Sequence, residues 1–157
     1  MSMITFLTVV SDEEIRELHN SPERIDSLID ESHTSIDLDK AWHGIHWLLT
    51  GSAFGDDASF SYLAAGGKEV SLADFGYGPP RTITSVQVAE WDDTLSKISR
   101  DELAGRFDAK AMLAAEIYPQ IWAEADSLDY LLQAYIRLKD FVAAAKRKQS
   151  GLLIYLS

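Results

Sequence analysis

Cysteine is absent from the 157 residues of this chain. Its absence excludes disulfide bonds, thiolate-bound metals and cysteine nucleophiles, and it is typical of proteins in a reducing compartment. The sequence also lacks an apolar run of the roughly 20 residues that a membrane-spanning helix needs. Its first residues show no basic stretch followed by an apolar one, as a secretory signal would. We therefore expect a cytoplasmic protein that does not contact a membrane.

Basic residues are scarce, with 14 Lys and Arg against 25 Asp and Glu, for a net charge of −11. Residues 11–40 hold ten acids and three bases, which gives this acidic segment a net charge of −7. Phosphate-binding surfaces need clustered Lys and Arg, so nucleic acid is excluded as a partner. An acidic surface attracts basic proteins. The alternative is that the charge only keeps the protein soluble.

The composition, with 46% hydrophobic and 25% charged residues, is that of a folded protein. No repeat, linker or low-complexity stretch divides the chain, so residues 1–157 form one domain. β-Branched and apolar runs at Ile4–Val10 and Leu152–Leu156 predict strands at both ends, with helices between them. The predicted fold class is α+β: a mostly helical single domain whose N-terminal and C-terminal strands pair in a small sheet.

Capping residues mark where the intervening helices begin. The predicted starts are Ser11, Ser21-Pro22, Thr84 or Ser85, Ser99 and Asp108, and the helix after Asp108 is expected to run to Ile117. A long amphipathic helix spans Leu128–Ala145 and carries Lys146, Arg147 and Lys148 in its last turn. The glycine-rich stretch 51–81 leaves room for a short helix near Ser59–Ala65 and an extended piece around Glu69–Leu72.

The segment 36–51 concentrates aromatic and titratable side chains, and we predict a helix from Leu38 to Thr50 that ends at Gly51. Its helical spacing separates two stripes. The apolar stripe contains Leu38, Trp42, Ile45 and Leu49, and the polar stripe contains Asp39, His43, His46 and Thr50.

Three interpretations of the polar stripe follow. Histidines three apart with a preceding carboxylate could hold a metal ion, but a third protein ligand from elsewhere would be needed. A histidine could act as an acid or base, although no nucleophile elbow or phosphate-binding loop accompanies it. The third interpretation is structural, with each imidazole bonded inside the fold. We predict neither a metal nor another cofactor.

Two further segments hold candidate binding residues. In Gly76–Arg81 the prolines leave too few N–H groups to hold a phosphate, so we expect a turn that positions Tyr77 and Arg81. In Glu116–Trp122 a proline ends a helix, and Tyr118 and Trp122 either form a pocket wall facing Trp42 or His46, or anchor the core.

Three motifs in this order, Leu38–Gly51, Gly76-Tyr-Gly-Pro79 and Glu116–Trp122, resemble the YfbM-like family of small bacterial proteins, a domain of unknown function. The resemblance runs nearly end to end. It implies a bacterial, intracellular protein with a single α+β domain, and it transfers no reaction. The family motif maps here onto Asp39, Trp42, His46, Thr50, Gly51, Tyr118, Pro119 and Trp122.

The leading hypothesis is a non-enzymatic binding or interaction protein, in one version an immunity-like protein whose acidic segment caps a basic partner; a small molecule is the other expected ligand. The alternative is a small hydrolase or metal-dependent enzyme that uses the Asp39, His43 and His46 helix face with Tyr118. The candidate binding residues are Asp39, Trp42, His43, His46, Thr50, Tyr77, Arg81, Tyr118 and Trp122.

Overall fold

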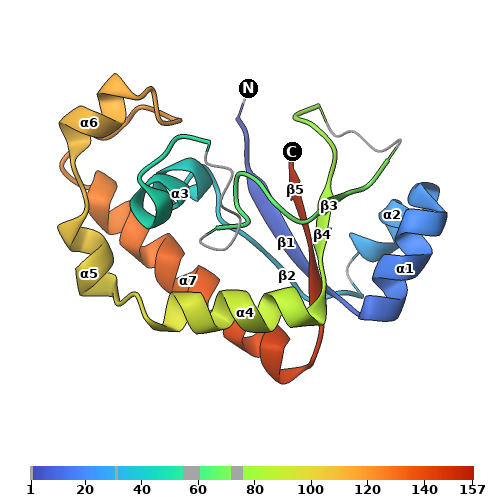
Figure 1. The fold of residues 1–157 in the computed structure, drawn as a ribbon. Helices are drawn as coiled ribbons and strands as arrows, with labels where there is room; N and C mark the ends of the chain where they lie inside the picture. Colours follow the sequence, from blue (N-terminus) through green and yellow to red (C-terminus); the bar gives the residue numbers. More distant parts are fainter. Residues whose placement is uncertain (1, 31, 55–60, 72–75) are drawn as a thin grey trace.

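The first and last strands pair with each other, as the sequence predicts. In the computed structural model, which describes residues 2–30, 32–54, 61–71 and 76–157, β1 (Thr5–Val10) runs antiparallel to β5 (Gly151–Leu156). Their register extends from Thr5 opposite Leu156 to Val10 opposite Gly151. This ladder lies at the centre of the molecule (Figure 1).

Three short strands complete an antiparallel sheet in the order β2-β1-β5-β4-β3. The strands β2 (Ser35–Asp37) and β4 (Arg81–Ile83) were not predicted, because three residues are too few for a period-two pattern to stand out. The extended piece expected around Glu69–Leu72 is represented by β3 (Lys68–Glu69), and Leu72 lies outside the described residues.

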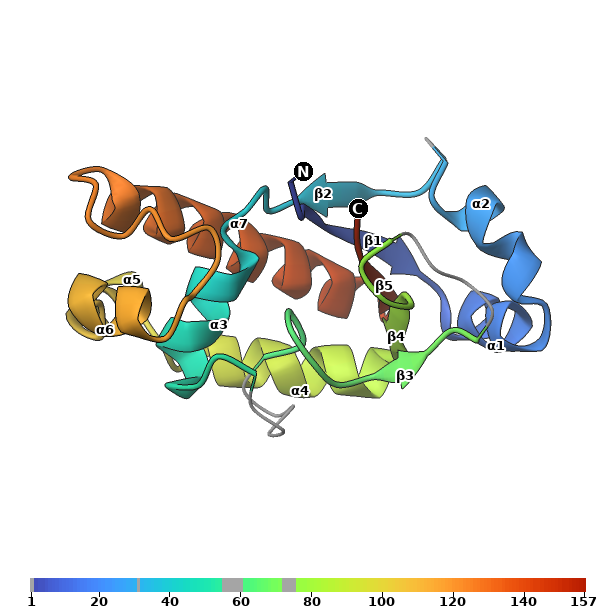
Figure 2. The ribbon, with the colours of Figure 1, turned by 90° about the horizontal axis from the view of Figure 1, so that it is seen from above.

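Helices cover the two faces of the sheet unequally. One face carries α1 (Asp12–Asn20), a 3-10 turn at Pro22–Arg24 and α2 (Ile25–Leu28). The other side holds α3 (Trp42–Thr50), α4 (Ser85–Ser96) and α7 (Ser127–Arg147). Figure 2 shows α5 (Arg100–Gly105) and α6 (Ala109–Ala114) at the end of the molecule opposite α1 and α2.

The strand β5 is buried on both faces, which explains its unbroken apolar sequence. Leu152 and Ile154 belong to the larger core, together with side chains of α3, α4 and α7. Leu153 faces the smaller core, where it packs with Ile15 and Leu18 of α1. No helix in the described part of the chain is both long and apolar enough to span a bilayer.

The caps fix most helix starts where they were predicted. Ser11 and Thr84 form capping boxes, and the side chains of Ser99 and Asp108 accept bonds from the first turns of α5 and α6. Helix ends were less well predicted. The helix α6 stops at Ala114 and not at Ile117, because Glu116 adopts a positive φ of 55°. Residues 61–65 are not helical, and the rest of the helix expected near Ser59 lies outside the described residues.

Candidate functional site

The helix α3 begins at Trp42, four residues later than predicted, so Leu38 and Asp39 do not belong to it. The Leu38 N–H donates to the Thr5 carbonyl at the sheet edge, and Asp39 has a φ of 51°, which no helix tolerates. The two-stripe interpretation was therefore wrong in its first turn. It was also wrong about the polar face, because His43 and His46 are as buried as their apolar neighbours.

Asp39 interacts with α7 rather than with the histidines. Its Oδ2 accepts a hydrogen bond of 3.0 Å from the Tyr130 hydroxyl, which in turn accepts one from the Lys40 N–H. Burial, together with the nearby Asp39 carboxylate, raises the pKa of Tyr130 to about 12. Asp39 thus joins the loop before α3 to α7.

His43 uses both ring nitrogens inside the fold. Its Nε2 donates to the Ala53 carbonyl at 2.9 Å, and its Nδ1 accepts from the Tyr118 N–H at 2.9 Å. These partners assign the neutral Nε2–H tautomer. Burial lowers the pKa of His43, and the ring lies between those of Trp42 and Phe54, with centroid distances of 4.9 and 4.8 Å. This imidazole has no lone pair left for a metal.

His46 is completely buried. Burial lowers its pKa to about 4, and the positive charges that His43 and Arg81 can carry act in the same direction. The imidazole is therefore neutral at pH 7. Across the described residues no three His, Cys, Asp or Glu side chains are grouped to hold a metal ion.

Trp42 and Tyr118 hold the N-terminal segment of the chain itself. The Trp42 indole N–H donates to the Met3 carbonyl, and the Tyr118 hydroxyl accepts from the Met3 N–H, both at 3.0 Å. The two rings lie 6.1 Å apart. These two hydrogen bonds thus hold the backbone of Met3, just before the start of β1.

Trp122 anchors the loop between α6 and α7. Its indole N–H donates to the Ile117 carbonyl at 2.7 Å, and its ring lies against Gly44 of α3. A Cβ atom on Gly44 would come within 2.7 Å of both Trp122 and Leu131. Sequence analysis missed Gly44, although a glycine between large side chains inside a helix signals a close approach.

Thr50, the last residue of α3, borders a surface groove of about 400 Å³. Its hydroxyl donates to the His46 carbonyl within the helix. Across the groove, the Arg106 guanidinium donates to the Leu48 carbonyl at the end of α3. No local pattern indicated a role for Arg106, because its partner Leu48 lies 58 positions away.

The sequence predicted a turn that positions Tyr77 and Arg81, and the structure places both beside one hollow. This second hollow, hereafter the Arg81 pocket, has a volume of about 170 Å³ and is lined also by Leu63, Glu69, Pro79 and Ile154. The Arg81 guanidinium donates to the carbonyls of Gly66 and Tyr62, both at 2.7 Å. Burial lowers the pKa of Arg81 to about 10, while the Glu69 carboxylate opposes the shift.

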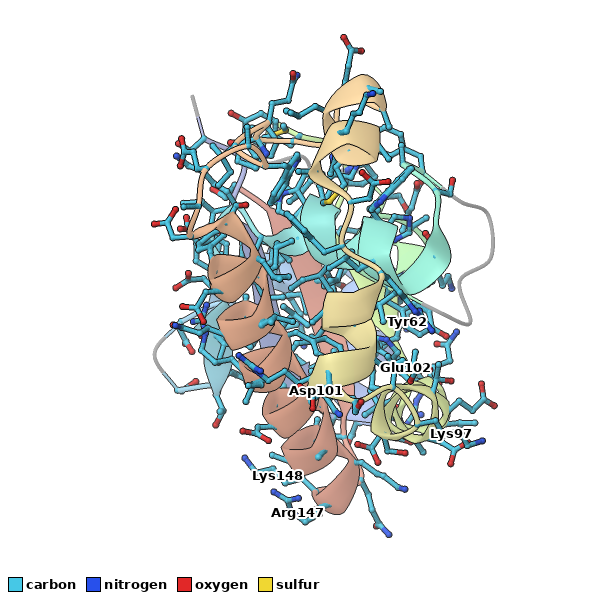
Figure 3. All side chains as sticks on the ribbon, turned by 90° about the vertical axis from the view of Figure 1, so that its left-hand side faces the viewer. Tyr62, Lys97, Asp101, Glu102, Arg147 and Lys148 are labelled. Carbon is cyan, nitrogen blue, oxygen red and sulfur yellow. The ribbon has the colours of Figure 1, made fainter. Side chains whose placement is uncertain are left out.

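The loop that Arg81 binds is held from its other side by an aromatic contact. Tyr62, labelled in Figure 3, packs edge-on against Trp91 of α4 with ring centroids 5.2 Å apart. The Arg81 pocket therefore has a packed wall on the side of residues 61–66.

Most of the acidic segment lies in α1, α2 and the turn between them, at the right-hand end of Figure 1, and its last residues return through β2 to the central strand β1. Its exposed acids among the described residues are Glu13, Glu17, Glu23, Asp26, Asp30 and Asp37. Glu14 is half-buried, and its Oε2 lies 2.7 Å from His33 Nε2.

Comparison with known proteins identifies similar chains. The sequence model of the family described as Domain of unknown function (DUF1877) matches residues 1–155. Protein YfbM of Escherichia coli (strain K12) is 31% identical over 128 residues, which are 77% of this chain and 75% of that protein. The crystal structure of a protein of unknown function, YfbM from Escherichia coli, matches with a TM-score of 0.79 and 22% identity, covering 99% of this chain and 100% of the other.

Proposed function

Because this chain belongs to the DUF1877 family of domains of unknown function, which assigns it no reaction, we propose a role from its own surface. The protein is a non-enzymatic interaction protein that binds a basic partner protein through its acidic segment. The partner is cytoplasmic, in keeping with the lack of cysteine in this chain.

The buried histidine and tryptophan side chains argue against chemistry at α3. His43 bonds to Ala53 and Tyr118, and Trp42 bonds to Met3. Asp39, the third member of the expected metal-binding or catalytic face, bonds to Tyr130 instead. A catalytic group must reach substrate, and these groups are engaged inside the fold.

The exposed acids of α1 and α2 carry the proposal. Four of these acids are solvent-exposed along α1, the 3-10 turn and α2: Glu13, Glu17, Glu23 and Asp26. Arg24 offsets part of this charge through a 3.5 Å pair with Glu17, but both side chains are at least half exposed, so the pair is weak. The field of this surface steers basic proteins toward it and repels acidic ones.

Affinity purification from the host tests the proposal. The bait is the whole protein, used at low salt (about 50 mM) and at about 500 mM, where charges on exposed groups are strongly screened. We expect a retained protein of basic composition at low salt and its loss at high salt. The same protein should be lost when Glu13→Gln, Glu17→Gln, Glu23→Gln and Asp26→Asn are combined.

A matched variant separates this surface from net charge. Asp101→Asn, Glu124→Gln, Asp129→Asn and Asp140→Asn remove the same number of exposed charges from outside the acidic segment, in α5, in α7 and in the residues just before α7. This variant should keep the partner. If both variants lose it equally, or if the wild-type protein retains no basic protein at low salt, the proposed function is wrong.

A further inference from the structure

The Arg81 pocket is a small hollow bordered by a partly buried cation, a neighbouring carboxylate and both polar and apolar residues. We propose that it binds a free α-amino acid with a short aliphatic side chain, with the ligand carboxylate at Arg81 and its ammonium group at Glu69. This site lies apart from the acidic segment and does not depend on the function proposed above.

Among the described residues, the Arg81 cation donates its hydrogen bonds to neutral carbonyl groups. Its Nη1 donates to the Gly66 carbonyl, and its Nη2 donates to the Tyr62 and Leu63 carbonyls at 2.7 and 3.3 Å. Within the described part of the chain, none of these bonds uses Nε. These bonds leave the Nε–H as a charged donor, and a carboxylate beside Arg81 can accept a hydrogen bond from it.

Glu69 lies directly opposite Arg81 in the pairing of β3 with β4. Side chains that face each other across antiparallel strands have Cβ atoms about 5 Å apart. The ion pairs formed between described residues include none between Glu69 and Arg81. The two side chains are therefore cross-strand neighbours that border the same hollow without a direct ion pair between them.

The order of charges selects a zwitterion. A simple carboxylate would be attracted by Arg81 but repelled by Glu69. A simple amine would be attracted by Glu69 but repelled by Arg81. An α-amino acid carries both charges on groups attached to the same carbon, so it can offer its carboxylate to Arg81 and its ammonium group to Glu69 at once. Glu69 is exposed and Arg81 is partly buried, so the carboxylate enters first.

The size and walls of the pocket limit the ligand further. Its volume of about 170 Å³ is below the roughly 300–1,000 Å³ of sites for drug-sized molecules. Since a water molecule takes about 30 Å³ in the liquid, the hollow accommodates only a molecule of roughly five to ten heavy atoms. Leu63, Pro79 and Ile154 are apolar, which suits a short aliphatic side chain.

Titration of the isotope-labelled whole protein with alanine and valine, followed by amide NMR, tests this proposal. We expect saturable shifts at the amides of Glu69, Gly78 and Arg81. N-acetylalanine lacks the ammonium group and alaninamide lacks the carboxylate, so both should bind at least about tenfold more weakly. If no saturable shift occurs with alanine or valine, or if either derivative binds as tightly as alanine, the proposal is wrong.

Two variants localise the binding. Glu69→Gln removes an exposed charge that the fold does not need, and it should weaken alanine at least about fivefold. Glu90→Gln removes an exposed glutamate of α4 outside the pocket and should have no effect. The variant with four neutralised acids in α1 and α2 should bind alanine normally, so loss of the basic partner and loss of the amino acid are separate results. Unchanged alanine affinity in Glu69→Gln would overturn the proposal.

Discussion

At the scale of single residues, the side chains that look most reactive are joined to distant parts of the backbone. The two partners of His43, Ala53 and Tyr118, lie 10 and 75 positions away in the sequence. Residue type and helical spacing identified this segment as unusual but could not distinguish a ligand from a structural bond. The same limit applies to Trp42, whose partner Met3 is 39 positions away.

Gly44→Ala should destabilise the protein even though alanine favours helices. The gain in helix propensity is about 1 kcal/mol. The added Cβ would approach Trp122 and Leu131 to 2.7 Å, and overpacking of this kind costs about 1–3 kcal/mol. We expect a net loss of up to about 2 kcal/mol in urea unfolding. Gly105→Ala, where the Cβ meets nothing within 4 Å, is the control and should be neutral or stabilising.

The pKa values of His46 and His33 should be shifted in opposite directions from that of a free histidine. Burial lowers the pKa of His46 to about 4. The stability that depends on its neutral form is therefore complete above pH 6.5 and is lost as the pH falls toward 4. The loss in unfolding free energy is on the order of 3 kcal/mol. The bond to Glu14 raises the pKa of His33, so that contribution is complete below pH 6.5 and is lost as the pH rises through the folded value.

An NMR titration of the imidazole protons checks both directions. His33 should titrate above 6.5 and His46 far below it. In urea unfolding, His33→Gln should abolish the loss of stability on the alkaline side, and in the NMR titration it should leave the titration of His46 unchanged. A His46 signal that titrates near 6.5 would contradict the structure.

At the scale of elements, the sequence predicted where helices start better than where they end. Ser11, Thr84, Ser99 and Asp108 cap helices because each side chain bonds to a backbone N–H three residues ahead, which the sequence displays directly. The start of α3 was wrong because the Leu38 N–H is taken by Thr5 of β1, a contact between segments 33 positions apart. The strands β2 and β4 exist for the same reason, since only their pairing with the central strands defines them.

Tyr118→Phe should loosen the N-terminal end of β1. The substitution removes the acceptor of the Met3 N–H and should cost about 1 kcal/mol of unfolding free energy. Hydrogen exchange should accelerate at the first amides of the chain and stay unchanged in α7. Tyr77→Phe, at a half-buried tyrosine of the Arg81 pocket, is the control and should leave these amides protected. Equal exchange in both variants would show that Tyr118 does not hold the N-terminal segment.

At the scale of the whole molecule, charge is unevenly distributed. The acidic segment lies at the end formed by α1 and α2, whereas Figure 3 shows Arg147 and Lys148 together at the C-terminal end of α7. Lys146 is held there by Asp92 of α4 at 3.4 Å. With a net charge of −11, repulsion among the acids opposes the compact state.

Salt should therefore stabilise the protein. Raising NaCl from about 50 to about 500 mM shortens the screening length from more than 10 Å to a few ångströms. We expect a rise of about 2–4 °C in Tm, which corresponds to about 1 kcal/mol for a chain of this size. Neutralising Glu13, Glu17, Glu23 and Asp26 should reduce the rise, with calorimetry as the measurement. A Tm that is independent of salt would show that the acids do not strain the fold.

The sequence by itself determined the class of fold, the pairing of the terminal strands and most helix starts. These depend on apolar periodicity and on caps, which act over a few residues. Only the tertiary structure decided that seven of the nine residues of the Trp42–Thr50 helix are buried, that Asp39 bonds to α7, and that Tyr77 and Arg81 share a pocket with Glu69. Each of these depends on contacts between residues distant in the chain, which packing sets and local pattern does not record.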